Sequence, residues 1–271
     1  MDIHASQPAT GGIRDPLVLR HDDSAVATLT LNRPAARNAL SQALMSALQD
    51  ALEDVADDNR INVIVLAAAG KAYCAGHDLK EMRADPRREV YDQLFRQCAR
   101  LMMTITRLPK PVIAKVHGIA TAAGCQLVAT CDLAVASEDA MFATPGVNIG
   151  LFCSTPMVAL SRAVGRKDAM EMLLTGNLLS AAEAKDKGLV NRVVPATALT
   201  AETQSLAQQI ASKSPLTVAI GKEAFYRQAD MSVVDAYAYA SEVMTRNMLA
   251  RDAGEGIDAF LQKRQPVWKG T

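Results

Sequence analysis

The sequence predicts an α/β fold in which strands and helices alternate up to about residue 194, followed by a helical C-terminal section. Short apolar or alternating runs, typical of strands, are separated by longer segments with helical periodicity. After Pro195 only helical patterns remain. We therefore expect a flexible leader over residues 1–16, a core over residues 17–195 and a helical region over residues 196–271, all within one domain.

The composition is that of an ordinary globular protein with no charge excess. Lys plus Arg and Asp plus Glu both number 29, so the formal net charge is zero, which argues against nucleic-acid and membrane-surface partners. Five cysteines without a CxxC pair favour free thiols and give no metal-ligand spacing. The polar start of the chain lacks the features of a targeting peptide, so the expected location is cytoplasmic.

The first elements are defined by apolar patterns and their boundaries. Residues 25–31 (AVATLTL) alternate and predict a strand that ends before Pro34. Ser41 is placed to cap a helix whose apolar side chains recur on one face: Leu44, Leu48, Leu52 and Val55. Residues 62–68 (NVIVLAA) form a continuous apolar run, which predicts a strand buried on both sides.

The later elements follow from proline, glycine and capping signals. A helix is expected over residues 87–107, stopped by the prolines that follow it, with short strands at 112–116, 133–136 and 190–194. Ser180 and Glu183 form a capping-box pattern, and Gly188 marks the end of that helix. Ser214 and Pro215 predict a further helix start, and residues 231–251 are expected to form one long helix.

Two turns built from small residues, 74–78 (CAGHD) and 121–126 (TAAGCQ), each follow a predicted strand. Small side chains let a ligand approach the main chain, and a helix that starts there presents unpaired N–H groups. Two such groups converging on one carbonyl oxygen would form an oxyanion hole. From spacing alone, ordinary strand-to-helix connections explain these turns better, since such turns are common. The sequence has no GxGxxG, P-loop or GxSxG motif.

A series of short segments lies in order over nearly the whole chain: LNRPAARNAL (31–40), AGHDLK (75–80), KPVIA (110–114), GIATAAGCQ (118–126), CD (131–132), FATP (142–145), RAVG (162–165), LTG (174–176), AKDKGL (184–189) and EGIDAFLQKR (255–264). Together these segments resemble the crotonase (enoyl-CoA hydratase/isomerase) superfamily. The stretches AGHDLKE, ATAAGCQLVA, FATPGVN and GLFCSTP are most similar to the subgroup of enoyl-CoA hydratase domain-containing protein 3.

The resemblance implies a spiral of ββα turns with a C-terminal helical trimerisation region, assembled as a homotrimer or a dimer of trimers. It places the oxyanion hole at the main-chain N–H groups of His77 and Ala123, where the family usually has glycine in place of Ala123. The substrate would be an acyl-CoA thioester, with no other cofactor. The residues implied to line the coenzyme A channel are Ala36, Arg37, Ala75, His77, Asp78, Leu79, Lys80, Ala123 and Gly124, with Phe260 and Lys263 from a neighbouring subunit.

The match fails at both glutamates that hydratases of this family use. Their positions hold Gln126 and Gly146. An amide can orient water but cannot exchange protons near neutral pH, and each lost acid/base group costs about 10²–10⁴-fold. We therefore predict weak or absent hydration. Cys153 stands where some relatives place a catalytic side chain, Asp78 is expected to brace its turn, and the direction of the His77 side chain is left open.

Three functional hypotheses follow from this combination. The first is a hydratase/isomerase-family enzyme with unusual acid/base groups. The second is a decarboxylase of malonyl-type thioesters, or a thioesterase, which relies on the hole together with His77 or Cys153. The third is an acyl-CoA-binding protein without catalysis. The small residues kept in both turns favour an enzyme.

Overall fold

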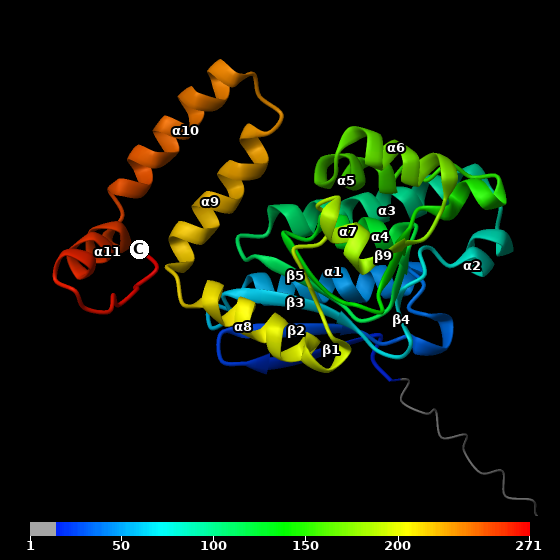
Figure 1. Cartoon of the computed structure of the whole chain (residues 1–271), viewed down its shortest axis with the longest axis horizontal. Helices are drawn as coiled ribbons and strands as arrows, with labels where there is room; N and C mark the ends of the chain where they lie inside the picture. Colours follow the sequence, from blue (N-terminus) through cyan, green and yellow to red (C-terminus); the bar gives the residue numbers. More distant parts are fainter. Residues whose placement is uncertain (1–14) are drawn as a thin grey trace, which may run out of the picture.

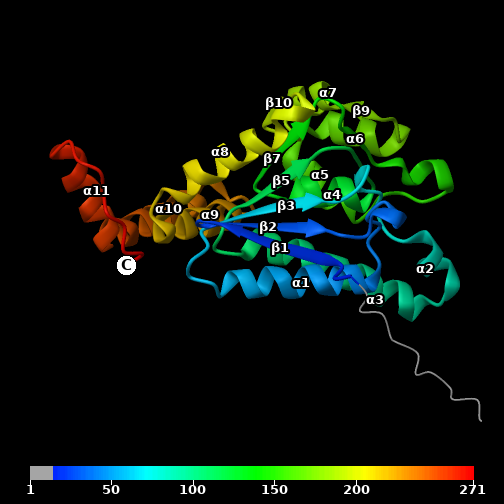
Figure 2. The ribbon, with the colours of Figure 1, turned by 90° about the horizontal axis from the view of Figure 1, so that it is seen from below.

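The computed structural model describes residues 15–271, and it contains two sheets flanked by helices (Figures 1 and 2). In the larger sheet, the first two strands pair antiparallel and every other neighbouring pair is parallel. Its strand order is β1 (Val18–Asp23), β2 (Val26–Leu31), β3 (Val63–Ala68), β5 (Val112–Val116), β7 (Leu133–Ser137) and β10 (Arg192–Val194). The prediction of a mixed α/β fold is confirmed.

The smaller sheet is built from very short strands that alternate along the chain with those of the larger sheet. β3 is followed by β4, β5 by β6, and β7 by β8, so the chain repeatedly passes from one sheet to the other. The strand order is β4 (Ala72–Cys74), β6 (Ile119–Thr121), β8 (Met141–Ala143) and β9 (Leu179–Ser180). This sheet positions the site described below.

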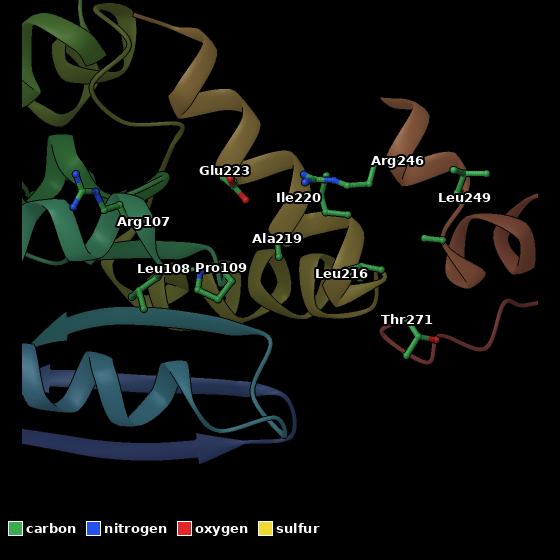
Figure 3. Close-up of a pocket in the computed structure, with 11 residues that line it drawn as sticks. Arg107, Leu108, Pro109, Leu216, Ala219, Ile220, Glu223, Arg246, Leu249 and Thr271 are labelled. Atoms are coloured by element: carbon green, nitrogen blue, oxygen red, sulfur yellow. The ribbon is translucent and has the colours of Figure 1, made fainter. Parts of the chain in front are cut away.

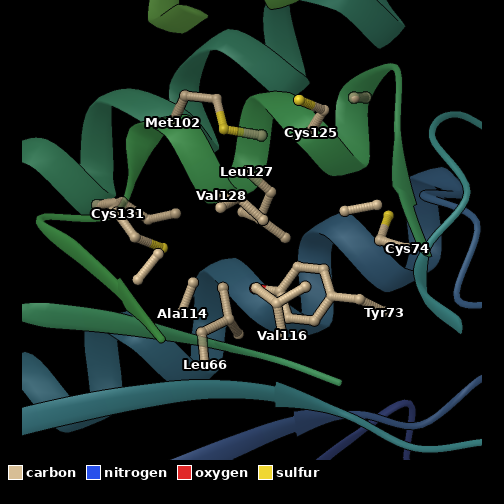
Figure 4. Close-up of a cluster of buried hydrophobic side chains, with 14 of the residues drawn as sticks. Leu66, Tyr73, Cys74, Met102, Ala114, Val116, Cys125, Leu127, Val128 and Cys131 are labelled. Atoms are coloured by element: carbon tan, nitrogen blue, oxygen red, sulfur yellow. The ribbon is translucent and has the colours of Figure 1, made fainter. Parts of the chain in front are cut away.

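Helices cover both faces of the larger sheet. On one face, the apolar stripe of α1 (Gln42–Ala56) packs into the main core together with α3 (Arg88–Arg107) and α4 (Ala123–Thr130). On the other face, α8 (Leu199–Ala211) buries Leu199 and Leu206 against Val63 and Val65. This arrangement explains why β3 is apolar on both sides. Figure 4 shows part of the main core, where Tyr73, Leu66 and Val116 lie close to cysteine and aliphatic side chains of α4 and its flanks.

The remaining helices complete the body (residues 15–214) and form an extended arm. Those of the body are α2 (Leu79–Ala84), α5 (Pro156–Ala163), α6 (Arg166–Thr175) and α7 (Ala181–Asp186). The arm, residues 215–271, contains α9 (Pro215–Gln228), α10 (Val233–Met248) and α11 (Arg251–Leu261) and stands away from the body (Figures 1 and 2). Within the part of the chain that the structure describes, no helix combines the length and the apolar character needed to cross a membrane.

A buried lysine anchors the arm to the body. The ammonium group of Lys222, on α9, donates hydrogen bonds to the carbonyl oxygens of Ile105 (2.8 Å) and Lys110 (2.9 Å) and to a carboxylate oxygen of Asp132 (2.7 Å). Tyr226, one turn further along α9, donates its hydroxyl to the other oxygen of Asp132 at 2.8 Å. All three ammonium protons of Lys222 therefore have acceptors, which offsets the cost of burying the charge.

Most of the elements expected from the sequence are present, with one clear correction. The Ser41 and Ser214 caps and the complete capping box at Ser180 are confirmed. The single helix predicted for residues 231–251 is wrong, because α10 ends at Met248 and a new helix begins at Arg251 after an extended Ala250. Of the predicted leader over residues 1–16, residues 1–14 lie outside the described part of the chain.

Candidate active site

Three turns that carry predicted site residues follow three neighbouring strands of the small sheet. β4, β6 and β8 are parallel and adjacent, so their carboxyl ends lie at one edge of the sheet. His77 follows β4, Ala123 follows β6, and Gly146 follows β8. Residues separated by almost 70 positions in the sequence are thereby brought to one site.

The first two turns touch so closely that only glycine fits at two positions. A Cβ atom added to Gly124 would lie 2.0 Å from the carbonyl oxygen of Cys74. A Cβ atom added to Gly76, which has φ of +92°, would lie 2.9 Å from the Cβ of Ala122 and 3.4 Å from the main-chain nitrogen of Ala123. Close main-chain approach of this kind requires residues without a side chain.

The N–H groups of His77 and Ala123 are both unpaired within residues 15–271. The N–H of Leu40 donates to the carbonyl of Gly76 at 2.7 Å, and the carbonyl of Leu40 accepts from the N–H of Asp78 at 3.2 Å. These two bonds flank His77 and do not use its N–H. Ala123 is the first residue of α4, so its N–H has no intrahelical acceptor. Two free main-chain donors therefore lie in turns that are in contact.

Ala122, which precedes the second donor, has a strained backbone. Its φ of 50° and ψ of −117° fall in a region that residues with a Cβ rarely adopt. Its N–H donates to the carbonyl of Ala143, at the end of β8, at 2.9 Å. This bond fixes the start of α4 to the neighbouring strand.

Asp78 braces the first turn, as predicted. Its carboxylate accepts hydrogen bonds from the N–H groups of Lys80 (3.0 Å) and Glu81 (3.3 Å) and so caps α2. Its other oxygen pairs with the guanidinium of Arg33 at 2.7 Å. Partial burial opposes ionisation, but the hydrogen bonds from Arg33 and the main chain prevail and lower the pKa of Asp78.

The His77 side chain points into the protein and is uncharged at neutral pH. Burial lowers its pKa to about 4. The ring lies edge-on to Phe95 of α3, with centroids 5.5 Å apart. Its Nε2 atom is buried and has no hydrogen-bond partner among the described residues.

Gln126, on α4, also faces α3. The Cys98 thiol approaches its amide oxygen at 3.9 Å, and burial raises the pKa of that thiol to about 12. Phe95 and Cys98 thus lie beside the site, although neither is among the site residues predicted from the sequence. No motif marks them, because they are ordinary apolar positions of a predicted helix.

Gly146, the position at which the resemblance implies the second hydratase glutamate, is enclosed by the main chain. A Cβ atom on Gly146 would lie 2.5 Å from the carbonyl oxygen of Leu151 and 2.8 Å from the Sγ of Cys153. Leu151 donates its N–H to the Gly146 carbonyl at 2.9 Å, which folds residues 146–151 into a tight loop. The Cys153 thiol is buried, which raises its pKa, although a hydrogen bond from the Gly146 N–H opposes this.

The residues implied to bind coenzyme A fall into two groups. Ala75 donates its N–H to the carbonyl of Arg37 at 3.1 Å, so these two segments lie side by side, and Lys80 lies exposed on α2 beyond them. Ala36 precedes Arg37, and Leu79 precedes Lys80 on the same surface. Phe260, which is 83% exposed, and Lys263 lie at the far end of the arm, and this single chain does not bring them to the site.

A cavity of about 610 Å³ lies elsewhere, at the junction of body and arm. Figure 3 shows its lining from the end of α3, from α9 and from the region where α10 ends, including Arg107, Ile220, Glu223 and Arg246. None of the residues predicted for the site lines it.

Comparison with known proteins establishes the family. A family model described as Enoyl-CoA hydratase/isomerase matches residues 21–271. The chain belongs to the enoyl-CoA hydratase/isomerase family, the crotonase superfamily. This family member is 48% identical over 265 residues to "Enoyl-CoA hydratase domain-containing protein 3, mitochondrial" of Homo sapiens, covering 96% of this chain and 87% of that protein. The protein of the same name from Xenopus laevis is 49% identical over 253 residues, covering 93% of this chain and 86% of that protein.

Solved structures agree with this assignment. An enoyl-CoA hydratase from Mycobacterium smegmatis has a TM-score of 0.92 and 57% identity, covering 94% of this chain and 99% of that one. Human enoyl-CoA hydratase domain-containing protein 3 has a TM-score of 0.90 and 48% identity, covering 93% of this chain and 100% of that one. The resemblance to this subgroup, expected from the sequence, is confirmed.

The expected cytoplasmic location is wrong by the same comparison. Five relatives at 45–49% identity all carry the word mitochondrial in their names. These names point to mitochondria. The expectation had rested on composition at the start of the chain, which is a weak indicator when relatives are unknown.

Proposed function

We propose that this family member binds acyl-CoA thioesters and stabilises their enolate form in an oxyanion hole made by the main-chain N–H groups of His77 and Ala123. The main support is that these two N–H groups have no hydrogen-bond acceptor among the described residues and lie in turns that contact each other. Such donors are pre-oriented and act where negative charge develops on the thioester oxygen, each contributing about 2.7–4 kcal/mol.

We propose further that hydration of enoyl thioesters is weak. No carboxylate occupies either glutamate position, since Gln126 carries an amide and Gly146 carries no side chain. The neighbouring Cys98 and Cys153 thiols have raised pKa values, so they are poor bases near neutral pH. With two acid/base roles lost, hydration should be about 10⁴-fold or more below that of a full hydratase.

Coenzyme A would cross the surface between the turn that holds Arg37 and the helix that holds Lys80. Both side chains are exposed cations beside the first hole turn, and cations of this kind suit the phosphates of coenzyme A. No cofactor besides the coenzyme A of the substrate is proposed.

The chain would act as a homotrimer or a dimer of trimers, with its core forming the ββα spiral of the superfamily. Exposed apolar side chains on the arm support this, since isolated helices rarely leave so many in water: Val233, Val234, Tyr237, Met244, Met248, Leu249, Phe260 and Leu261. A neighbouring copy would cover them and would bring Phe260 and Lys263 to the coenzyme A site.

The test uses acetoacetyl-CoA, whose enolate absorbs in the near ultraviolet. The wild type should bind it and raise the bound enolate fraction. Ala123→Pro removes one N–H, and proline is tolerated at the first residue of a helix, whereas Ala123→Gly keeps the N–H. The enolate fraction should fall by about 10²–10³-fold in A123P and persist in A123G.

Thermal melts of both variants control for folding, and crotonyl-CoA measures hydration in parallel. Rapid loss of enoyl absorbance in the wild type would overturn the proposal of weak hydration. Failure of the wild type to bind any thioester would overturn the proposed function itself.

A further inference from the structure

We infer that the His77 imidazole selects the acyl chain: its Nε2 atom binds an uncharged oxygen function, a hydroxyl or a carbonyl, on the acyl chain beyond the thioester carbonyl. This inference rests on the proposed function, because it takes the thioester carbonyl to lie in the hole formed by the N–H of the same residue.

The first support is an unsatisfied polar atom. Nε2 of His77 is buried and has no hydrogen-bond partner among residues 15–271. Buried polar side-chain atoms are nearly always paired, because an unpaired one loses its hydration without compensation. The edge-on contact with Phe95 fixes the ring but supplies no hydrogen bond. A ligand that pairs with Nε2 would remove this penalty and gain affinity.

The second support is the place to which the imidazole points. His77 contacts Phe95, and Gln126 contacts Cys98. Phe95 and Cys98 are three residues apart on α3 and so share one face of that helix. The imidazole and the Gln126 amide therefore reach the same face of α3, beside the position that the proposed function assigns to the first missing glutamate.

The third support is that the imidazole and the two groups that share its face of α3, Cys98 and Gln126, are uncharged. The imidazole is neutral because burial lowers its pKa to about 4, and the Cys98 thiol is neutral because burial raises its pKa to about 12. Gln126 is an amide. A neutral imidazole can donate or accept a hydrogen bond, whereas neither Cys98 nor Gln126 offers a counter-charge to a buried anion. These groups match an uncharged oxygen rather than a carboxylate.

The position of that oxygen follows from the covalent structure. One residue supplies both the hole N–H and the imidazole, so the two contacts are separated only by the length of a histidine side chain. With the thioester carbonyl oxygen held at the N–H, Nε2 reaches an atom a few bonds further along the acyl chain. A substituent on the third or fourth acyl carbon fits this requirement.

The experiment measures dissociation constants by calorimetry for butyryl-CoA, 3-hydroxybutyryl-CoA, 4-hydroxybutyryl-CoA and succinyl-CoA. The variants are His77→Leu, which removes the polar atom, and His77→Gln, whose amide extends toward the place of Nε2. Every substitution keeps the main-chain N–H, so the hole remains. Free coenzyme A serves as the reference ligand, and each thioester affinity is compared with that of free coenzyme A in the same variant.

The wild type should bind one hydroxybutyryl thioester about tenfold more tightly than butyryl-CoA, as expected for one neutral hydrogen bond. H77L should lose this preference, and H77Q should retain part of it. Equal affinity for butyryl and both hydroxybutyryl thioesters, an unchanged preference in H77L, or tightest binding of succinyl-CoA would each overturn the inference. If the wild type binds no thioester, the proposed function fails instead, which separates the two failures.

Discussion

Replacing Tyr73 by phenylalanine should stabilise the protein. Tyr73 is fully buried in the main core, and its hydroxyl has no hydrogen-bond partner among the described residues (Figure 4). An unsatisfied buried hydroxyl costs about 1–3 kcal/mol. Its removal leaves a void on the order of 15 Å³, worth about 0.3 kcal/mol against the variant. The free energy of unfolding should therefore rise by about 1–2.5 kcal/mol.

The matched control makes the same chemical change where the hydroxyl is satisfied. Tyr226 donates its hydroxyl to the Asp132 carboxylate at 2.8 Å, so Tyr226→Phe should lower the free energy of unfolding by about 1.5–3 kcal/mol. Urea unfolding measures both variants at one fixed protein concentration, so that any assembly would affect both apparent stabilities equally. The reasoning is refuted if Y73F leaves the unfolding free energy unchanged or lowers it while Y226F behaves as expected.

Three further predictions concern the site. Ala122→Gly should relieve the backbone strain caused by the positive φ of residue 122, so the melting temperature of the variant should not fall below that of the wild type. A clear decrease would show that the methyl group of Ala122 stabilises the protein by more than the strain costs. Gly146→Glu should destabilise the protein by about 1–3 kcal/mol and restore no hydration, because its Cβ meets the Leu151 carbonyl; hydration in this variant would contradict the closed loop. The folded-state pKa of His77 lies at about 4, below its ordinary 6.5, so the free energy of unfolding should fall as pH drops from 6.5 to 4. His77→Gln should flatten this part of the pH–stability curve. An equally steep fall in H77Q would exclude His77 as the cause.

The sequence predicted the larger sheet better than the smaller one. β3 and β5 are apolar runs of five or six residues, long enough to be recognised by pattern. β4, β6 and β8 have three residues each, too few for a period to be visible, and none of them was predicted. Their pairing is nevertheless what brings His77 and Ala123 together.

At the site, local signals were predictable and long-range contacts were not. The bracing role of Asp78 was predicted because aspartates in turns commonly accept hydrogen bonds from nearby main-chain N–H groups, and the structure confirms it. The contact of His77 with Phe95 joins a turn to a separate helix, and no sequence pattern in either segment predicts it. The close approach of the Leu151 carbonyl to Gly146 likewise depends on the conformation of the loop, which the residue types alone do not predict.

The closed loop at Gly146 has a consequence for how this lineage can change. In a site where a glutamate had merely been lost, one codon change could bring it back and selection could test it at once. Here a carbonyl oxygen and a thiol already fill the space, so the loop from Gly146 to Cys153 would first have to be rebuilt. Each intermediate would lose packing without gaining a proton-transfer group. The proposed departure from hydratase chemistry would thus be fixed by the shape of this loop, and a library that aims to reverse it must vary residues 146–153 together.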